Sequence, residues 1–98
     1  MNWYRTAALG DHGDTLYGQH MKQFMAETKK SLEKLRATVA NDGLNRVSDR
    51  FRGEVRRRIL LTPPPSKLDS MSMSQLEEIA RQVDQINEMI ERYTPRTI

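Results

Sequence analysis

The sequence predicts an all-α protein in which an antiparallel two-helix hairpin is followed by a third, amphipathic helix. Apolar residues recur every three or four positions in three stretches, the spacing that lines one side of an α-helix. Between the second and third stretches, Pro63-Pro64-Pro65 lacks backbone N–H donors and stops a helix. We predict an irregular aromatic arm, a helical hairpin, a Pro/Ser/Met linker, an amphipathic helix and a tail, over residues 1–13, 14–61, 62–73, 74–93 and 94–98.

The stretch Ser74–Tyr93 has the most regular pattern. Its apolar residues fall at intervals of 3, 4, 3, 4 and 3: Leu76, Ile79, Val83, Ile86, Ile90 and Tyr93. The flanks of this heptad-like stripe are neutral or apolar, which favours a bundle of three or more helices over a two-stranded coiled coil. Ser74 and Glu77 predict a capping box at the start of the helix. We expect the stripe to contact another helix, either within the domain or in another chain.

The hairpin is predicted from two further stripes and a short turn between them. The first helix, capped by Asp14, runs to about Ala40 with an inward face of Met21, Met25, Thr28, Leu32, Leu35 and Val39. Gly43 is expected to take the left-handed conformation that closes it. The second helix runs from Leu44 to about Leu61, with an apolar face of Leu44, Val47, Phe51, Val55 and Ile59. So short a turn predicts antiparallel packing. After it, the triple proline is expected to form an extended spacer.

Charge is distributed unevenly along the chain. The 16 basic and 13 acidic residues give a net charge of +3, but residues 44–61 carry +4 and residues 75–93 carry −3. A basic and an acidic helix are natural neighbours, within one chain or between subunits. Glu77, Asp84 and Glu91 repeat every seven residues beside the apolar stripe. Exposed ion pairs stabilise weakly, so we expect these charges to select partner and register while apolar burial supplies the stability.

The residue types disfavour catalysis, metals and membranes. The chain has no cysteine, which excludes disulfides and thiolate chemistry, and its two histidines, His12 and His20, have no third ligand at metal-binding spacing. No phosphate-binding glycine loop or nucleophile motif is present. We therefore expect no enzyme activity, no cofactor and no small-molecule substrate. The longest apolar run, Ile59-Leu60-Leu61, is too short to span a membrane.

These features favour a non-enzymatic structural or adaptor subunit that mediates protein–protein association in a larger assembly, such as a virion or another multi-subunit particle. The partner is either a second copy or another protein. The expected interface residues are the six stripe residues of 74–93 together with Trp3 and Tyr4. The two aromatics either fold back onto the helices or dock into a neighbouring subunit. The first residues lack a signal-peptide pattern, so we expect the protein in the cytoplasm or inside an assembled particle.

The alternative is a small basic nucleic-acid-binding protein that uses the arginine-rich second helix. Arg46, Arg50 and Arg57 point away from the apolar face of that helix, and arginine suits phosphate geometry. The same three side chains would equally suit an acidic protein partner. A helix-turn-helix over 74–93 is disfavoured, because no glycine breaks the helix near Asp84 and the segment that would read the bases is acidic.

Overall fold

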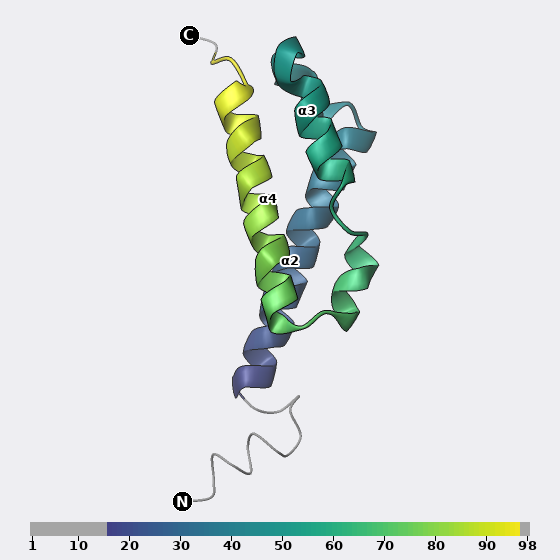
Figure 1. The fold of residues 1–98 in the computed structure, drawn as a ribbon, viewed down its shortest axis with the longest axis vertical. Helices are drawn as coiled ribbons and strands as arrows, with labels where there is room; N and C mark the ends of the chain where they lie inside the picture. The colour runs from purple at the N-terminus through teal and green to yellow at the C-terminus, as the bar shows by residue number, and fades with distance from the viewer. Residues whose placement is uncertain (1–15, 97–98) are drawn as a thin grey trace, which may run out of the picture.

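The computed structural model describes residues 16–96, and in that range the chain is helical with no β-strand. The elements are α2 (Leu16–Ala40), the 3-10 turn η2 (Gly43–Arg46), α3 (Asp49–Leu60), the 3-10 turn η3 (Pro65–Ser70) and α4 (Met73–Tyr93). The prediction of an all-α fold is confirmed. Helices α2 and α4 run in one direction and α3 in the other (Figure 1). The predicted arm, with Trp3 and Tyr4, and the cap at Asp14 lie outside the described residues.

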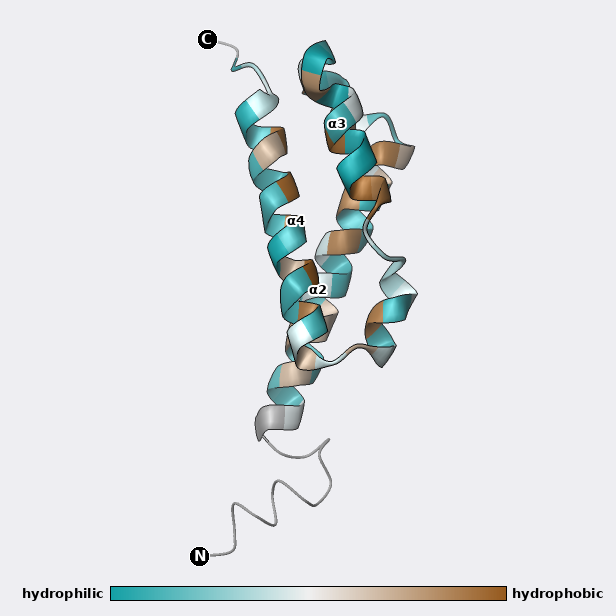
Figure 2. Ribbon diagram, viewed as in Figure 1, coloured by the Kyte–Doolittle hydropathy of each residue, from teal (hydrophilic) through white to brown (hydrophobic). Residues whose placement is uncertain are grey.

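One continuous core joins all five elements. Its buried apolar side chains are Leu32, Leu35, Leu44, Val47, Val55, Ile59, Leu68, Leu76, Ile79, Val83 and Ile86. Brown, apolar segments of α2, α3 and α4 turn toward one another and teal segments turn outward (Figure 2). The three- and four-residue spacing explains this arrangement, because it gathers the apolar side chains on one side of each helix.

The turn after α2 differs from the prediction at Gly43. The left-handed residue is Asp42, with φ 55° and ψ 28°, and no described glycine has a positive φ. Aspartate tolerates this conformation because its short polar side chain hydrogen-bonds locally. Gly43 is needed for a different reason: a Cβ there would lie 2.7 Å from Cγ2 of Thr38 and 3.0 Å from its carbonyl oxygen. The glycine lets the chain pass close to the end of α2.

The prediction of one helix from Leu44 to Leu61 is wrong. The 3-10 turn η2 comes first, Val47 and Ser48 are extended, and α3 begins only at Asp49. Ser48 followed by Asp49 is a typical helix start, since both residue types suit the free N–H groups of a first turn. Leu44 and Val47 still reach the core from η2 and the bend, so the predicted apolar face survives the interruption.

The predicted linker over 62–73 is also more structured than expected. Pro64 is extended, with φ −60° and ψ 142°, but Pro65 then begins η3. Proline suits the first helical position because its missing N–H would have no partner there. The turn places Leu68 in the core with no exposed surface. Residues 65–70 therefore act as part of the bundle.

Both ends of α4 are tied by specific contacts. The capping box uses Ser72 and Gln75 rather than the predicted Ser74 and Glu77, because the helix begins at Met73: Ser72 Oγ accepts from the Gln75 backbone N–H, and Gln75 Oε1 accepts from the Ser72 N–H at 2.8 Å. At the other end, the Ser48 N–H donates to the Tyr93 carbonyl at 2.9 Å. The Tyr93 ring stacks on Phe51 with centroids 3.9 Å apart. These contacts join the end of α4 to the start of α3.

Candidate association surfaces

The predicted interface stripe of α4 lies mostly inside the molecule. Leu76, Ile79, Val83 and Ile86 are between 0% and 8% exposed, and α4 packs against both α2 and α3. Ile90 and Tyr93 are half-buried at the upper part of the same stripe. The stripe thus stabilises this chain's own fold, since removing such side chains from water is the main favourable term in folding. A surface for partners has to be sought on the outer sides of the helices.

The three predicted arginine contacts stand on the outer surface in different settings. Arg46, at the end of η2, and Arg50, in the first turn of α3, are exposed, and the Arg50 guanidinium lies 5.4 Å from the centre of the Phe51 ring. Arg57 is also exposed, but it pairs with Glu54 within α3. Of the three, Arg46 and Arg50 have no carboxylate partner among residues 16–96.

Two other arginines hold the fold together. Arg52 donates to the carbonyl oxygens of Leu44, Asn45 and Val47 at 3.0–3.1 Å, which satisfies the backbone of the η2 turn. Arg36 of α2 donates to the Thr62 carbonyl at 2.6 Å and so ties α2 to the chain just after α3. The sequence pattern does not reveal these two roles, because contacts between residues far apart along the chain leave no local signal.

The basic α3 and the acidic α4 touch, but no ion pair joins them in the described part of the chain. Their ion pairs are local: Glu54 with Arg57 and Arg58 in α3, Asp49 with Arg52, and Glu78 with Arg81 in α4. The expected pairing of the two helices within the chain is therefore absent from residues 16–96. They meet through apolar side chains, and most acidic groups of α4 face outward.

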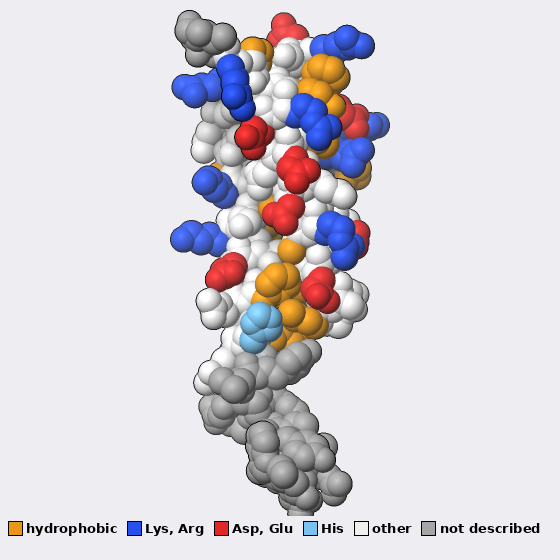
Figure 3. Space-filling view, turned by 90° about the vertical axis from the view of Figure 1, so that its left-hand side faces the viewer, with side chains coloured by type: hydrophobic (Ala, Val, Ile, Leu, Met, Phe, Trp, Pro, Cys, Tyr) orange, Lys and Arg blue, Asp and Glu red, His pale blue; other side chains and the backbone are white. Residues whose placement is uncertain are grey.

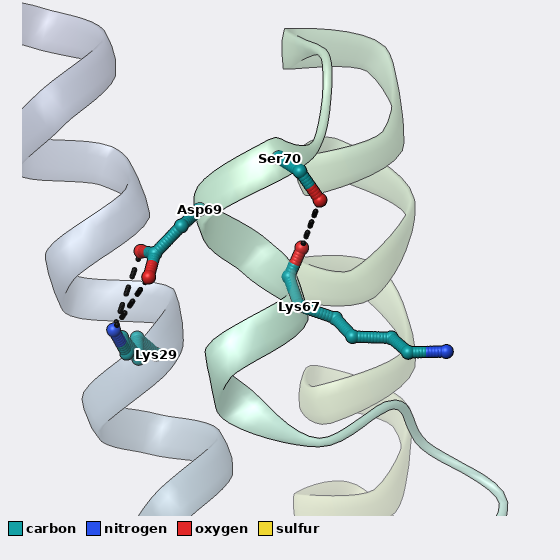
Figure 4. A network of polar contacts seen from close by, with 4 residues as sticks. All are labelled: Lys29, Lys67, Asp69 and Ser70. Atoms are coloured by element: carbon teal, nitrogen blue, oxygen red, sulfur yellow. Dashed lines mark hydrogen bonds and ion pairs between the residues drawn. The ribbon is translucent and has the colours of Figure 1, made fainter.

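The one ion pair between elements in residues 16–96 anchors η3. Lys29 Nζ of α2 lies 3.3 Å from Asp69 Oδ1 and 3.4 Å from Oδ2 (Figure 4). In the same turn, Ser70 Oγ donates to the Lys67 carbonyl, while the Lys67 side chain extends into solvent (Figure 4). Lys29 and Arg36 thus mark the flank of α2 that η3 and the end of α3 cover.

The Glu54 carboxyl in α3 has a lowered pKa. Hydrogen bonds from Arg58 and Arg57 lower the pKa of its carboxyl below the usual range, because both favour the charged form. This is the behaviour of an exposed helix ion pair. The shift marks no acid–base site.

The other flank of the α2–α4 pair is an open groove of about 390 Å³. Its lining comes from both helices: Ser31, Lys34, Leu35 and Thr38 from α2, and Asn87 and Ile90 from α4. Leu35 and Ile90 form an apolar base, and the remaining residues are small or polar. A space-filling view of the side on which α4 lies shows acidic side chains along its middle and basic ones near both margins (Figure 3).

Other hollows also lie open on the surface. One of about 310 Å³ lies between the end of α3 and the middle of α4, lined by Arg58, Leu61 and Gln82 among others. Leu61, which lines this hollow, is 75% exposed, and its neighbour Leu60 is 52% exposed. Within residues 16–96, no three acidic or histidine side chains come together in a way that would hold a metal ion. No helix in that range is long and apolar enough to cross a membrane.

Comparison with protein-family models, curated proteins and solved structures finds no match for this chain, so its function has to be argued from its own residues.

Proposed function

We propose that this protein is a non-enzymatic helical subunit that holds a larger assembly together by binding other protein surfaces. The main support is the outer face of α4. Its acidic stripe, Glu77, Asp84 and Glu91, is exposed and has no cationic partner among the described residues. A charged stripe left unpaired beside an open groove suits recognition, because complementary charge selects partner and register.

The architecture that goes with this function is a bundle in which α2 and α3 form an antiparallel hairpin and α4 closes it with its heptad-like stripe. In this arrangement the apolar residues make a stable scaffold and the outer faces carry the contacts. Trp3 and Tyr4 stay predicted as further anchors. The setting would be a cytoplasmic complex or an assembled particle such as a virion.

The test measures the native size of the protein in extracts of the cells or particles that contain it. A lysate at physiological salt is fractionated by size, with and without nuclease, and the protein is followed with a specific antibody. We expect elution well above the mass of one chain in both samples. Elution as a single chain would contradict the proposal.

A nucleic-acid-binding function is the alternative, supported by Arg46 and Arg50 of the three predicted arginines and by Arg56, which replaces Arg57 because Arg57 pairs with Glu54. Arg46, Arg50 and Arg56 are exposed and lack a carboxylate partner among residues 16–96. If they bind phosphates, the affinity of the purified protein for DNA or RNA falls steeply as salt rises, and nuclease collapses the native complex. Both effects should disappear in a variant with Arg46, Arg50 and Arg56 changed to glutamine.

A further inference from the structure

We propose that the open α2–α4 groove is a dimer interface, in which two copies of this chain pack face to face with their helices parallel. This inference rests on the proposed function and names one partner, a second copy. It concerns the groove lined by Ser31, Lys34, Thr38 and Asn87 over Leu35 and Ile90.

Within residues 16–96, the groove is the open side of the α2–α4 pair, whereas α3 and η3 cover the other side. Lys29 and Arg36 on one flank of α2 bind Asp69 and the Thr62 carbonyl, so η3 and the end of α3 lie there. Ser31 and Thr38 lie on the opposite flank; Ser31 is exposed, and Thr38 is half-buried because Gly43 of η2 packs against its methyl group. Their short side chains would let another helix approach closely enough to contact Leu35 and Ile90, both of which already belong to the core or pack against it.

The two rims of the groove carry opposite charge. On α2, Lys34 lines the groove and Lys30 lies one turn before it, while the exposed Glu27 lies one turn before Ser31, so this rim carries a net charge of +1. On α4, Asp84 and Glu91 lie three residues before and four residues after Asn87, which places them on the flank of α4 that lines the groove. Lys30, Lys34, Asp84 and Glu91 are all exposed, and none of the four forms an ion pair within residues 16–96.

The orientation of the two-fold axis between the two copies decides whether opposite charges face each other. A two-fold axis parallel to the helices sets each basic α2 rim against the acidic α4 rim of the other copy, whereas an axis across the helices sets like against like. Rotation about the parallel axis leaves every height along the groove unchanged, and because α2 and α4 run in the same direction, the facing helices of the two copies run parallel (Figure 1). Lys34 and Asn87 line the same groove, so Lys34 would face the stretch of the partner's α4 around Asn87, and Asp84 and Glu91 each lie within about one helical turn of that residue. The surface is self-complementary and the assembly closes at two copies.

The test uses paired charge reversals and sedimentation velocity across a range of protein concentrations. The purified wild-type chain should reach the mass of two chains. Lys30→Glu with Lys34→Glu makes both rims acidic, and Asp84→Lys with Glu91→Lys makes both basic. Each double variant alone should dimerise at least about tenfold more weakly. An equimolar mixture of the two should recover the dimer, and so should one chain carrying all four reversals, because each restores opposite charges across the interface.

The control for the lysine reversals is Arg56→Glu with Lys67→Glu, which makes the same change in charge on exposed residues away from the groove. It should dimerise like the wild type. A wild-type chain that stays monomeric at every concentration, or reversal variants that dimerise normally, would overturn the inference. Neither result would contradict the proposed function, because the protein could still elute as a large native complex through another surface or partner. Conversely, a nuclease-sensitive native complex would overturn the proposed function without affecting the dimer.

Discussion

The two flanks of the α2–α4 pair face different surroundings although the same two helices form both. On one flank, α3 and η3 contribute Val55, Ile59 and Leu68, which have no exposed surface. On the other flank, Ser31, Thr38 and Asn87 border a groove that no described element fills. The covered flank packs against α3 and η3 by burying apolar side chains. The open flank presents small side chains between charged rims.

This difference separates stability from recognition. Burial of large apolar side chains is non-directional and accounts for most of the folding free energy. Charges at an exposed rim add little stability but discriminate strongly between correct and incorrect partners. A substitution on the covered flank should therefore change the free energy of unfolding, and one on the open flank should leave it almost unchanged.

The largest expected effect is that of a charge placed on the covered flank. Val83→Asp buries a carboxylate without a partner in a position that is 3% exposed. We expect a loss of about 3–5 kcal/mol in unfolding free energy, with release of α4. Urea denaturation followed by circular dichroism measures it. The matched change on the open flank, Asn87→Asp, should stay within about 0.5 kcal/mol of the wild type. Unchanged helicity and midpoint in Val83→Asp would refute the described role of α4.

Next comes the removal of the apolar contact that η3 makes. Leu68→Ala leaves a cavity where the side chain is fully buried, and we expect a loss of about 2–5 kcal/mol. Leu61→Ala is the matched control, since that side chain is 75% exposed, and its effect should stay within about 0.5 kcal/mol. Equal thermal midpoints for the two variants would show that η3 is only a spacer.

Alanine substitutions at Gly43 and Gly53 should have smaller effects on the free energy of unfolding, and the two effects should have opposite signs. Gly43→Ala places a Cβ 2.7 Å from Thr38 Cγ2 and should destabilise the protein by about 1–3 kcal/mol. A Cβ at Gly53, inside α3, meets nothing within 4 Å. Gly53→Ala should therefore stabilise by about 0.5–1 kcal/mol, because alanine loses less backbone freedom on folding. Chemical denaturation of both variants measures the sign. A destabilised Gly53→Ala would reveal a contact on the outer face of α3.

The smallest expected effect is the pH dependence due to Glu54. Its two arginine partners lower the pKa of this carboxyl in the folded chain, so its contribution to stability is present above the unfolded pKa. That contribution is lost as pH falls through the folded pKa. Comparing acid unfolding of the wild type with Glu54→Gln isolates it, and the difference between the two should shrink as the pH falls. A difference that grows toward acid would contradict this assignment.

The apolar pattern predicted the fold class and the core but not the joints between elements. Every residue predicted for the inward face of the second stretch is buried or half-buried, although η2 and a bend replace its first turn. Apolar spacing is a local property, so it survives such interruptions. The break at Ser48 depends on Arg52 and on the Tyr93 carbonyl, and the latter lies far along the chain. The Ser48-Asp49 pair was the local signal available for it.

The candidate surfaces were harder to predict for the same reason. Sequence periodicity identifies an apolar stripe on α4 but does not say what covers it, and α2 and α3 cover most of it. The acidic repeat of Glu77, Asp84 and Glu91 was visible in the sequence. Its position beside a groove depends on the direction in which α2 and α4 pack, which only the assembled helices define. The groove itself therefore had no sequence signal.

The link between Tyr93 and the start of α3 has a consequence for synthesis of the protein. Four of the eleven buried apolar side chains belong to α4, and the Ser48–Tyr93 hydrogen bond and the Phe51–Tyr93 stack come from its final turn. A nascent chain that has exposed only α2 and α3 to solvent lacks the surface that would cover their apolar sides. Stable folding must then await the emergence of α4 from the ribosome, and a chain truncated before residue 93 should be aggregation-prone and sensitive to proteases.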